Sequence, residues 1–534
     1  MTSLFLILIV VVIVTCIWLN NLSARIGVPT LLAFMLLGIV FGNVGAIPVY
    51  LDDKEFAENV CTIALIFIMF YGGFGTRWEA VKPVVRESVL LASAGVIVTA
   101  ALTGMFCHFA LGWNWAEALL LGSVVGSTDA ASVFSILRSK RLGLKNNTAP
   151  MLEMESGSND PCAYMLTAVM ISIVNGTSSA GATAWMVFAQ IAFGAGIGVL
   201  IAKLASWALQ QMNFSTQGFD TLFLFAVAIA AYAIPDVLGG NGYLSAYIVG
   251  IFLGNEEFKG KKAMVGFFDG LTGLMQVLIF FLLGLLARPS QLHRAILPAL
   301  AISVFMLLVA RPAAVFGILT PFRKYPFSQQ CLISFVGLRG AASIVFAIMA
   351  VAGTTALNTD LFNIVFCLVL ISISLQGSLI PWMARKLDMI DSTANVLKTF
   401  NDYTEEAELQ FGEIQIGPES PWNGKAVKEL GLPGKLLLVM ILRGNQRIRP
   451  NGDTVLMPGD KVVTLSHSYN GGEASLYEKV VKPGSRRVGR KISEHPGNGL
   501  LVMVIRGQKS IIPTGDTVLE AGDRLVILNE NTQI

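Results

Sequence analysis

The stretch Glu155-Ser156-Gly157-Ser158-Asn159-Asp160-Pro161 places two carboxylates inside a segment that is otherwise apolar. Met151-Leu152 precede it, and an apolar run from Tyr164 to Val174 follows it. An ionised side chain at bilayer depth is costly, so such residues face a protein interior or an aqueous cavity and mark ion or proton pathways. The stretch therefore predicts an ion site inside a membrane.

Composition indicates a polytopic α-helical membrane protein. Hydrophobic residues make up 54% of the 534 residues and charged residues 14%, and the mean hydropathy is +0.66, well outside the range of soluble domains. The formal charge of +3 suggests no nucleic-acid partner. The six cysteines and four histidines are scattered singly, so we expect no disulfide framework, metal cluster or cofactor.

Apolar segments predict about thirteen transmembrane helices, because each is long enough to cross about 30 Å of hydrocarbon. The first lacks a basic flank and a cleavage site, so we expect it to be retained. The segments are residues 4–19, 28–46, 58–75, 86–110, 116–137, 149–174, 184–208, 219–238, 240–256, 265–287, 295–320, 329–352 and 360–384.

The loops between these segments alternate in charge. One set is rich in lysine and arginine, whereas the other offers only Lys54, Arg288 and Arg294. By the positive-inside rule, the N-terminus is expected outside and the C-terminus in the cytoplasm. The basic set comprises Arg25; Arg77, Lys82 and Arg86; Arg138, Lys140, Arg141 and Lys145; Lys259, Lys261 and Lys262; Arg323 and Lys324; Arg385 and Lys386.

After Leu387 the sequence becomes polar and contains an internal repeat. Residues 437–444 recur as residues 500–507, and Gly459-Asp460 recurs as Gly522-Asp523, all at one offset of 63. Apolar runs bounded by Gly, Pro, Asn and Asp predict strands, so we expect two β-rich α+β lobes. The predicted organisation is a transmembrane domain (1–388), a linker (389–411) and two lobes (412–470 and 471–534).

Two intramembrane stretches are poorly suited to continuous helix. The first runs from Gly122 to Asp129, and the second holds Gly157 and Pro161 around Asn159-Asp160. Irregular backbone at membrane depth survives only inside protein or along a cavity, and broken helices form the ion sites of secondary transporters. The alternative is that Thr128-Asp129 caps a helix half and Asn159 hydrogen-bonds across the bundle.

Asp160 has the chemistry of an exchange site. A carboxylate among hydroxyl, amide and carbonyl oxygens binds a hard monovalent cation and also a proton. Burial favours the protonated form and a nearby cation favours the ionised form, so the two ligands compete. A carrier that moves only when Asp160 is neutralised trades one proton for one cation.

Other charged residues invite pairing. Glu155 and Arg339 are expected to form a structural ion pair, because a lone intramembrane arginine is costly. The sequence does not name the partner of Arg311, for which Asp129 is one candidate. Asp269 and Gln276 could face the cavity, but a capping or surface role is equally compatible with the sequence.

The sequence lacks the motifs that would indicate an enzyme. Gly194-Ala-Gly196-Ile-Gly198 has no preceding strand, so it indicates close helix packing rather than dinucleotide binding. No P-loop or hydrolase motif is present. A potassium channel is disfavoured because no TVGYG-like filter appears. A third functional class left open is a sensor that transports no ions and whose membrane part only anchors the tail.

Three motifs together resemble the cation/proton antiporter family of the NhaP type, which includes the eukaryotic sodium/proton exchangers. They are Ser127-Thr128-Asp129, Glu155–Asp160 and Gly337-Leu338-Arg339-Gly340. The repeated tail resembles the C-terminal lobe of RCK (TrkA-C) domains, and the combination resembles NhaP/CvrA-type potassium/proton antiporters. The resemblance implies inverted six-plus-six repeats with a linking helix, two crossing unwound helices, elevator-like alternating access and homodimers.

The resemblance also implies roles for individual residues. Asp160 would bind the ion and the proton, with oxygens from Ser156 and Thr128 completing a potassium or sodium site. Asp129 would hold a water or a helix end, Asn159 marks the electroneutral branch, and Glu155 with Arg339 would be the stabilising pair.

The expected function is electroneutral exchange of internal potassium, or of sodium, for external protons across a bacterial inner membrane.

Two departures from the family pattern stand out. The third span, at Phe70–Phe74, lacks the acid that some members add, and no Rossmann half precedes the tail lobes. The lobes are expected either to bind a small regulatory ligand or only to strengthen dimerisation.

Overall fold

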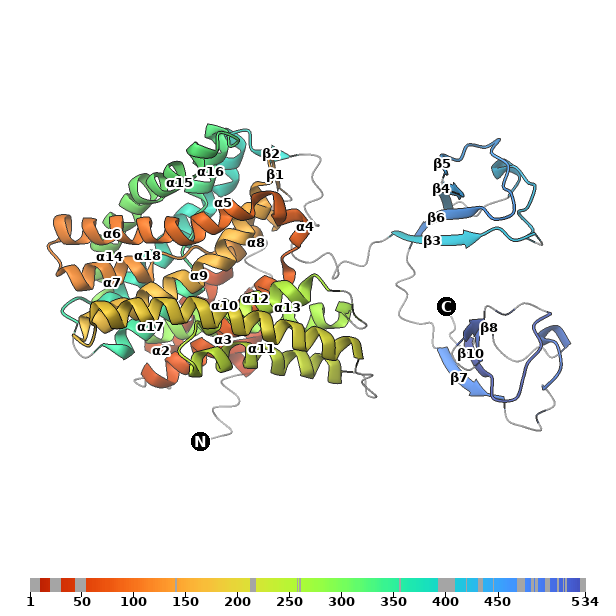
Figure 1. Ribbon diagram of the computed structural model, residues 1–534, viewed down its shortest axis with the longest axis horizontal. Helices are drawn as coiled ribbons and strands as arrows, with labels where there is room; N and C mark the ends of the chain where they lie inside the picture. The colour runs from red at the N-terminus through yellow and green to blue at the C-terminus, as the bar shows by residue number, and fades with distance from the viewer. Residues whose placement is uncertain are drawn as a thin grey trace. The chain divides into compact units, whose positions relative to one another are not determined.

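The chain divides into two compact units, Met1–Glu405 and Glu406–Ile534 (Figure 1). The computed structural model describes residues 10–19, 30–43, 54–139, 142–211, 218–256, 258, 261–354, 357–391, 409–418, 420–430, 436–444, 446–467, 476–481, 485, 488–494, 500–506, 509–511, 513 and 516–528.

The first unit is helical and contains two groups of helices. In the first group, which we call the scaffold, α3 packs against α12 and α13, and α10 packs against α11 and α12. The described scaffold helices are Val10–Leu19, α2 (Thr30–Asn43), α3 (Lys54–Gly75), α10 (Ala180–Gln211), α11 (Phe219–Val237), α12 (Gly242–Gly254) and α13 (Lys261–Leu286).

The second group, which we call the core, consists of two sets of helices with the same order. Each set has a long helix with a π-helical turn, then a broken helix, then another long helix. The first set is α4 (Trp78–Val81), α5 (Val85–Leu90), α6 (Val96–Leu111), α7 (Trp115–Val124), α8 (Ala130–Ser139) and α9 (Thr148–Val174). The second set is α14 (Pro289–Phe305), α15 (Arg311–Leu319), α16 (Phe327–Phe335), α17 (Ala341–Gly353), α18 (Leu361–Ile371) and α19 (Ser378–Lys386).

Seven helices among the described residues are long and apolar enough to cross a membrane. Shorter apolar helices, including α7 and α17, accompany them. The predicted polytopic helical architecture is confirmed, whereas the number of thirteen spans stays a prediction. The seven are Glu55–Gly75, Trp78–Leu111, Ala180–Gln211, Phe219–Val237, Ala263–Leu286, Pro289–Phe322 and Leu361–Lys386.

Two helices are interrupted inside the core. Residues 125–129 separate α7 from α8, and residues 336–340 separate α16 from α17. The interruptions touch, because the Asp129 N–H donates to the Leu338 carbonyl over 2.8 Å. Every peptide group in a membrane needs such an internal partner, so each interruption helps to satisfy the other.

The prediction of a helix break at Gly157 and Pro161 is wrong. Helix α9 runs without interruption from Thr148 to Val174 and includes Pro161. Proline removes a single N–H from the helix ladder, and the bonds on either side of it persist. The second break lies instead in the Gly337–Gly340 motif.

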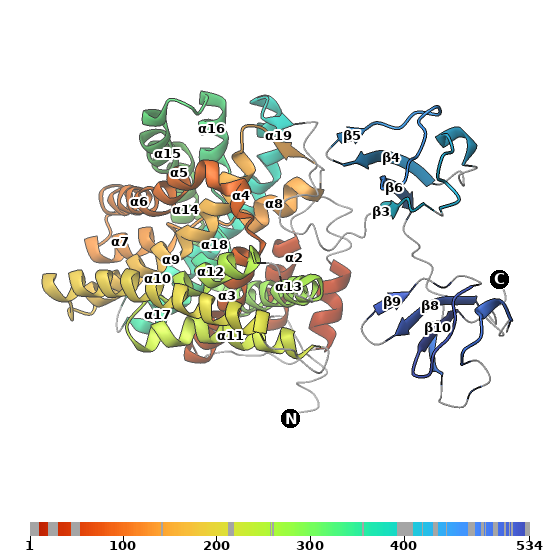
Figure 2. The same ribbon diagram turned by 45° about the vertical axis from the view of Figure 1, so that its right-hand side comes forward.

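Strand pairing shows where the chain leaves the first unit. Strand β1 (Gly143–Leu144), just before α9, pairs antiparallel with β2 (Ile390–Asp391), just after α19. Beside this pair, the Lys145 ammonium lies 3.0 Å from the Asp388 carboxylate. Residues 389–391 of the predicted linker therefore pack with the membrane unit. We call this end of the helical bundle, where α9 starts, the tail end; α8 and α19 lie side by side there (Figure 2).

The second unit contains two four-stranded antiparallel sheets with the same topology. The first has the order β3-β6-β4-β5 and the second β7-β10-β8-β9. The repeat seen in the sequence therefore folds into two lobes of one design. The strands are β3 (Leu409–Gln415), β4 (Leu436–Arg443), β5 (Gln446–Ile448), β6 (Lys461–His467), β7 (Leu476–Val480), β8 (Leu500–Arg506), β9 (Lys509–Ile511) and β10 (Arg524–Leu528).

Candidate functional site

A cavity of about 500 Å³ lies between the core and the scaffold. Its core wall comes from α9, from the unwound stretch before α8 and from the start of α17. Its scaffold wall comes from α3 and α13. The polar lining residues are Thr128, Asp129, Ser135, Glu153, Ser156 and Asp160 on the core side and Tyr71, Asp269, Thr272 and Gln276 on the scaffold side.

Helix α9 presents one polar face to this cavity. Glu153, Ser156, Gly157 and Asp160 all line it, and their spacing of three, four and seven residues places them on one side of a helix. Gly157 is required there for steric reasons, since a β-carbon would lie 2.3 Å from the Tyr247 ring of α12. The glycine lets α12 approach the helix that carries the site.

Asp160 is buried, with 6% of its surface exposed. Its Oδ1 atom is enclosed and has no hydrogen-bond partner among the described residues. A buried carboxylate oxygen normally finds a partner, because leaving it without one is costly. A bound cation or a proton at Asp160 would remove this cost.

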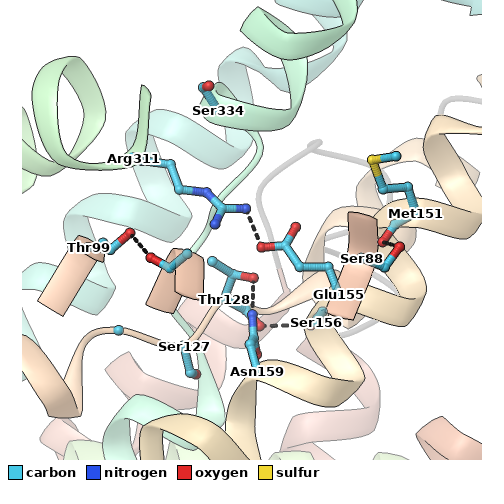
Figure 3. A network of polar contacts seen from close by, with 12 residues as sticks. Ser88, Thr99, Ser127, Thr128, Met151, Glu155, Ser156, Asn159, Arg311 and Ser334 are labelled. Atoms are coloured by element: carbon cyan, nitrogen blue, oxygen red, sulfur yellow. Dashed lines mark hydrogen bonds and ion pairs between the residues drawn. The ribbon is translucent and has the colours of Figure 1, made fainter. Parts of the chain in front are cut away.

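Thr128, Ser156 and Asn159 form a hydrogen-bonded group (Figure 3), and Asn159 directly precedes Asp160 in the chain. The Asn159 amide donates to the Thr128 hydroxyl over 2.6 Å, and the Ser156 hydroxyl donates to the Thr128 carbonyl over 2.7 Å. These bonds fix the unwound stretch against α9. Thr128 and Ser156 line the cavity, whereas Asn159 is completely buried.

Asp129 caps α8 and also lines the cavity. Its carboxylate accepts hydrogen bonds from the Ser132 hydroxyl over 2.5 Å and from the Ser132 N–H over 3.2 Å. A β-carbon at Gly340 would lie 1.9 Å from Asp129 Oδ2. The second interruption can therefore cross the first at this point only because residue 340 is glycine.

The structure corrects the predicted Glu155–Arg339 pair. Glu155 forms its ion pair with Arg311, whose Nη2 lies 2.5 Å from Glu155 Oε1, and Figure 3 shows the two side chains pointing toward one another. The sequence could not choose between the two arginines, because both are expected in neighbouring buried segments. The choice depends on how α9, α15 and α16 pack.

Arg339 instead satisfies backbone carbonyls. Its guanidinium donates to the Gly126 carbonyl over 2.9 Å and to the Ser127 carbonyl. These carbonyls follow the C-terminal end of α7, where a positive charge is favourable. The Arg339 N–H donates to the Ser372 hydroxyl over 3.0 Å, so both interruptions are held by this one residue.

The cavity stops at Asp160, and beyond it core and scaffold are in contact. The Asn241 amide of α12 donates to the Pro161 carbonyl of α9 over 2.8 Å. One turn further along α9, Tyr164 packs against the scaffold Tyr243 with ring centres 5.0 Å apart. The cavity therefore reaches Asp160 from the tail end of α9, and packed side chains lie on its other side.

Several residues of the site did not stand out in the sequence. Glu153 and Tyr71 line the cavity but were not predicted there. The spacing from Glu153 to Asp160 would have indicated Glu153. Asp269 and Gln276, which the sequence left undecided, line it as well.

A carboxylate with an open oxygen, beside two crossing helix interruptions and between two groups of helices, matches the arrangement in which secondary transporters bind their ions. Comparison with known proteins gives the family. The chain belongs to the sodium/hydrogen exchanger family, whose transmembrane model matches residues 9–386, and a TrkA-C domain model matches residues 411–465 and 476–534. It is therefore a secondary cation/proton antiporter and not an enzyme, as predicted.

Individual relatives agree with this assignment. The chain is 33% identical to the K(+)/H(+) antiporter NhaP2 of Shewanella oneidensis over 453 residues, which cover 84% of this chain and 78% of that protein. It is 32% identical to the K(+)/H(+) antiporter NhaP of Alkalimonas amylolytica over 448 residues, 83% of this chain and 78% of that one. The solved sodium proton antiporter MjNhaP1 of Methanocaldococcus jannaschii has a similar fold, with a TM-score of 0.62 at 22% identity over 71% of this chain and 97% of that one.

Proposed function

We propose that this antiporter exchanges one internal potassium ion for one external proton at Asp160. The observation that carries this proposal is the buried Oδ1 of Asp160, which has no partner among the described residues and belongs to a residue that lines the cavity. The hydroxyl of Thr128 and that of Ser156, both on residues of the same cavity wall, supply further oxygens for a hard cation.

One-for-one exchange follows from the surroundings of Asp160. To reach the other side of the membrane, the core has to slide past a scaffold surface that includes the buried ring of Tyr243. An ionised carboxylate is strongly disfavoured against such a surface, whereas a carboxylate neutralised by either a cation or a proton is not. The core therefore does not move while Asp160 is ionised and unoccupied, and each movement across the membrane carries either one cation or one proton.

Potassium is favoured by two similarities. NhaP2 and NhaP are named as K(+)/H(+) antiporters, and the tail matches TrkA-C domains. Sodium is the second candidate, because the chain is also 25% identical to the Na(+)/H(+) antiporter NhaS2 of Synechocystis over 388 residues, 69% of this chain and 71% of that protein.

Proton movement in sealed proteoliposomes tests the proposal. A pH gradient is imposed, and potassium, sodium or lithium is added with the membrane potential either clamped or free. We expect potassium to dissipate the gradient equally under both conditions and the Asp160→Asn variant to be silent. Dissipation by sodium or lithium alone would overturn the choice of potassium, and normal exchange by Asp160→Asn would overturn the site.

The same experiment separates antiport from the rival classes. A potassium channel would pass a current that follows the voltage without moving protons. A membrane-anchored sensor would show no cation flux that depends on Asp160.

We also infer a homodimer in a bacterial inner membrane, with the N-terminus outside and the tail in the cytoplasm. Helix α10 supports an interface with protein or lipid, since Trp185, Phe188 and Trp207 are largely exposed along it. The alternating loop charges support the orientation. For the tail we propose a regulatory role through a small ligand. Cross-linking in native membranes and labelling of single cysteines from either side test the dimer and the orientation.

A further inference from the structure

The scaffold wall of the cavity carries its own polar stripe. Asp269, Thr272, Gly273 and Gln276 of α13 all line the cavity, and their spacing of three, four and seven residues places them on one face of that helix. The remainder of α13 is mainly apolar. Polar residues on a membrane helix normally face a protein interior or water and not lipid. Here the stripe faces the cavity wall that carries Asp160.

Asp269 is not a capping residue. Helix α13 begins at Lys261, so Asp269 lies about 12 Å along the helix axis from its start, in the third turn of the helix. Its Oδ1 accepts a hydrogen bond from the Tyr71 hydroxyl of α3 over 3.1 Å. Tyr71 is itself buried, with 4% of its surface exposed. The carboxylate of Asp269 is therefore held in place from a second helix.

Carboxylates line both walls of the cavity. Glu153 and Asp160 lie on α9, about 8 and 18 Å along the helix axis from its start. Asp269 faces them from α13 on the opposite wall. A cation that enters the cavity to reach the open oxygen of Asp160 therefore shares this space with a second carboxylate.

We propose that Asp269 is a second cation-binding residue, which holds the incoming ion between core and scaffold and sets the apparent affinity of the exchanger. The stretch Phe70–Phe74 of the third span supplies no acid, and Tyr71 in that stretch instead positions the acid of α13. The inference rests on the proposed antiport at Asp160. Because Asp269 belongs to the scaffold, it does not travel with the core and leaves the one-for-one exchange unchanged.

Titration of potassium against exchange rate in proteoliposomes tests the inference on the full-length protein. For Asp269→Asn we expect the half-saturating potassium concentration to rise by about tenfold, the order expected for loss of one partly screened charge in a cavity of low dielectric constant. The maximal rate should stay within about twofold of the wild type. Asp269→Glu should restore most of the affinity, and Tyr71→Phe should weaken it by about two- to threefold, since it removes one hydrogen bond.

A second readout does not depend on transport. Potassium should raise the melting temperature of the detergent-solubilised wild type relative to a bulky organic cation, and Asp269→Asn should need more potassium for the same shift. Glu55→Gln is the matched control, because Glu55 is exposed at the start of α3 and does not line the cavity. It should behave as the wild type in both measurements.

The outcomes separate this inference from the proposed function. An inactive wild type would contradict the proposed function. An active wild type with a silent Asp160→Asn and an unchanged titration in Asp269→Asn would overturn only the role of Asp269. A fall in maximal rate at constant half-saturation would also overturn it, since that result assigns Asp269 to the movement of the core. If Asp269→Asn fails to fold, Tyr71→Phe decides by the same criteria.

Discussion

Arg311 Nη2 lies 2.5 Å from Glu155 Oε1, and the two side chains are 3% and 1% exposed. The pair joins α15 to α9, so it connects the two sets of core helices close to the proposed ion site. Its depth makes each charge dependent on the other, because a buried ion that loses its partner is strongly destabilising.

Replacing Arg311 alone should therefore destabilise the protein severely. We expect Arg311→Met to cost about 3–5 kcal/mol, because it leaves Glu155 charged and without its ion-pair partner. Thermal unfolding of the detergent-solubilised protein, followed by size-exclusion chromatography, measures the loss. Arg294→Met, which replaces an exposed arginine of α14, is the control and should leave the melting temperature unchanged.

A double variant tests whether the two side chains act as a pair. Glu155→Leu with Arg311→Met removes both charges, and apolar replacement of a buried ion pair is often close to neutral. The double variant should be more stable than Arg311→Met alone. If the loss of stability in the double variant equals the sum of the losses measured for Glu155→Leu and Arg311→Met singly, the two residues do not depend on each other.

Gly340→Ala should disrupt the crossing of the two helix interruptions. The added β-carbon would lie 1.9 Å from Asp129 Oδ2, and Asp129 is already held by its hydrogen bonds to Ser132. We expect a loss of about 1–3 kcal/mol, as for overpacking in other protein cores, together with loss of exchange in proteoliposomes. Wild-type exchange by this variant would mean that the two interruptions can move apart far enough to admit the added methyl group.

Gly317→Ala is the matched control for this substitution. Gly317 lies in α15, and a β-carbon there would meet nothing within 4 Å. Because alanine is more favourable than glycine inside a helix, we expect equal or slightly higher stability, by about 0.5–1 kcal/mol, and unchanged exchange.

Glu153→Gln should weaken cation capture without stopping transport. Glu153 lines the same cavity as Asp160, but the two lie seven residues apart, about 10 Å along α9. At that distance the carboxylate attracts cations into the cavity without needing to contact the ion at Asp160. We expect the half-saturating potassium concentration to rise by about two- to threefold at low ionic strength, with the maximal rate retained.

The salt dependence of this effect provides its check. Attraction over such a distance is screened by ions when the cavity contains water, so the difference from the wild type should shrink when an inert salt is added. A difference that persists at high ionic strength would indicate direct coordination by Glu153 instead.

The tail should lose stability in acid through two equivalent ion pairs. Arg443 donates two hydrogen bonds to Asp460, over 2.8 and 2.7 Å, and Arg506 does the same to Asp523 in the second lobe, over 2.9 Å for each bond. The hydrogen bonds from Arg443 lower the pKa of Asp460, and those from Arg506 lower the pKa of Asp523. A carboxylate with a lowered pKa in the folded state stabilises it above the pKa of the unfolded chain, about 3.9, and this stabilisation is lost as the pH falls through the folded value.

Urea unfolding of the tail expressed alone, followed by circular dichroism, measures this contribution. Arg443→Met should lower the urea midpoint at pH 7, and its difference from the wild type should narrow below about pH 4. Lys428→Met is the control, because the Lys428–Asp453 pair is exposed and such pairs contribute little. An equal loss for both variants would contradict the special role of the buried aspartate.

Much of this protein is determined by its sequence alone. The apolar segments specify a helical membrane protein, because the hydrocarbon region leaves the backbone few other ways to pair its polar groups. The motif around Asp160 and the repeat in the tail are enough to indicate the family, since both consist of residues that are neighbours in the chain. The helix interruption at residues 125–129 is predictable for the same local reason.

Only the tertiary structure decided which distant residues meet. It pairs Glu155 with Arg311 and gives Arg339 to backbone carbonyls. It keeps α9 continuous through Pro161, and it brings Asp269 of α13 to the cavity that holds Asp160. Each of these outcomes depends on the packing of helices far apart in the sequence, where sterics and buried charge select one partner among several of the same chemical type.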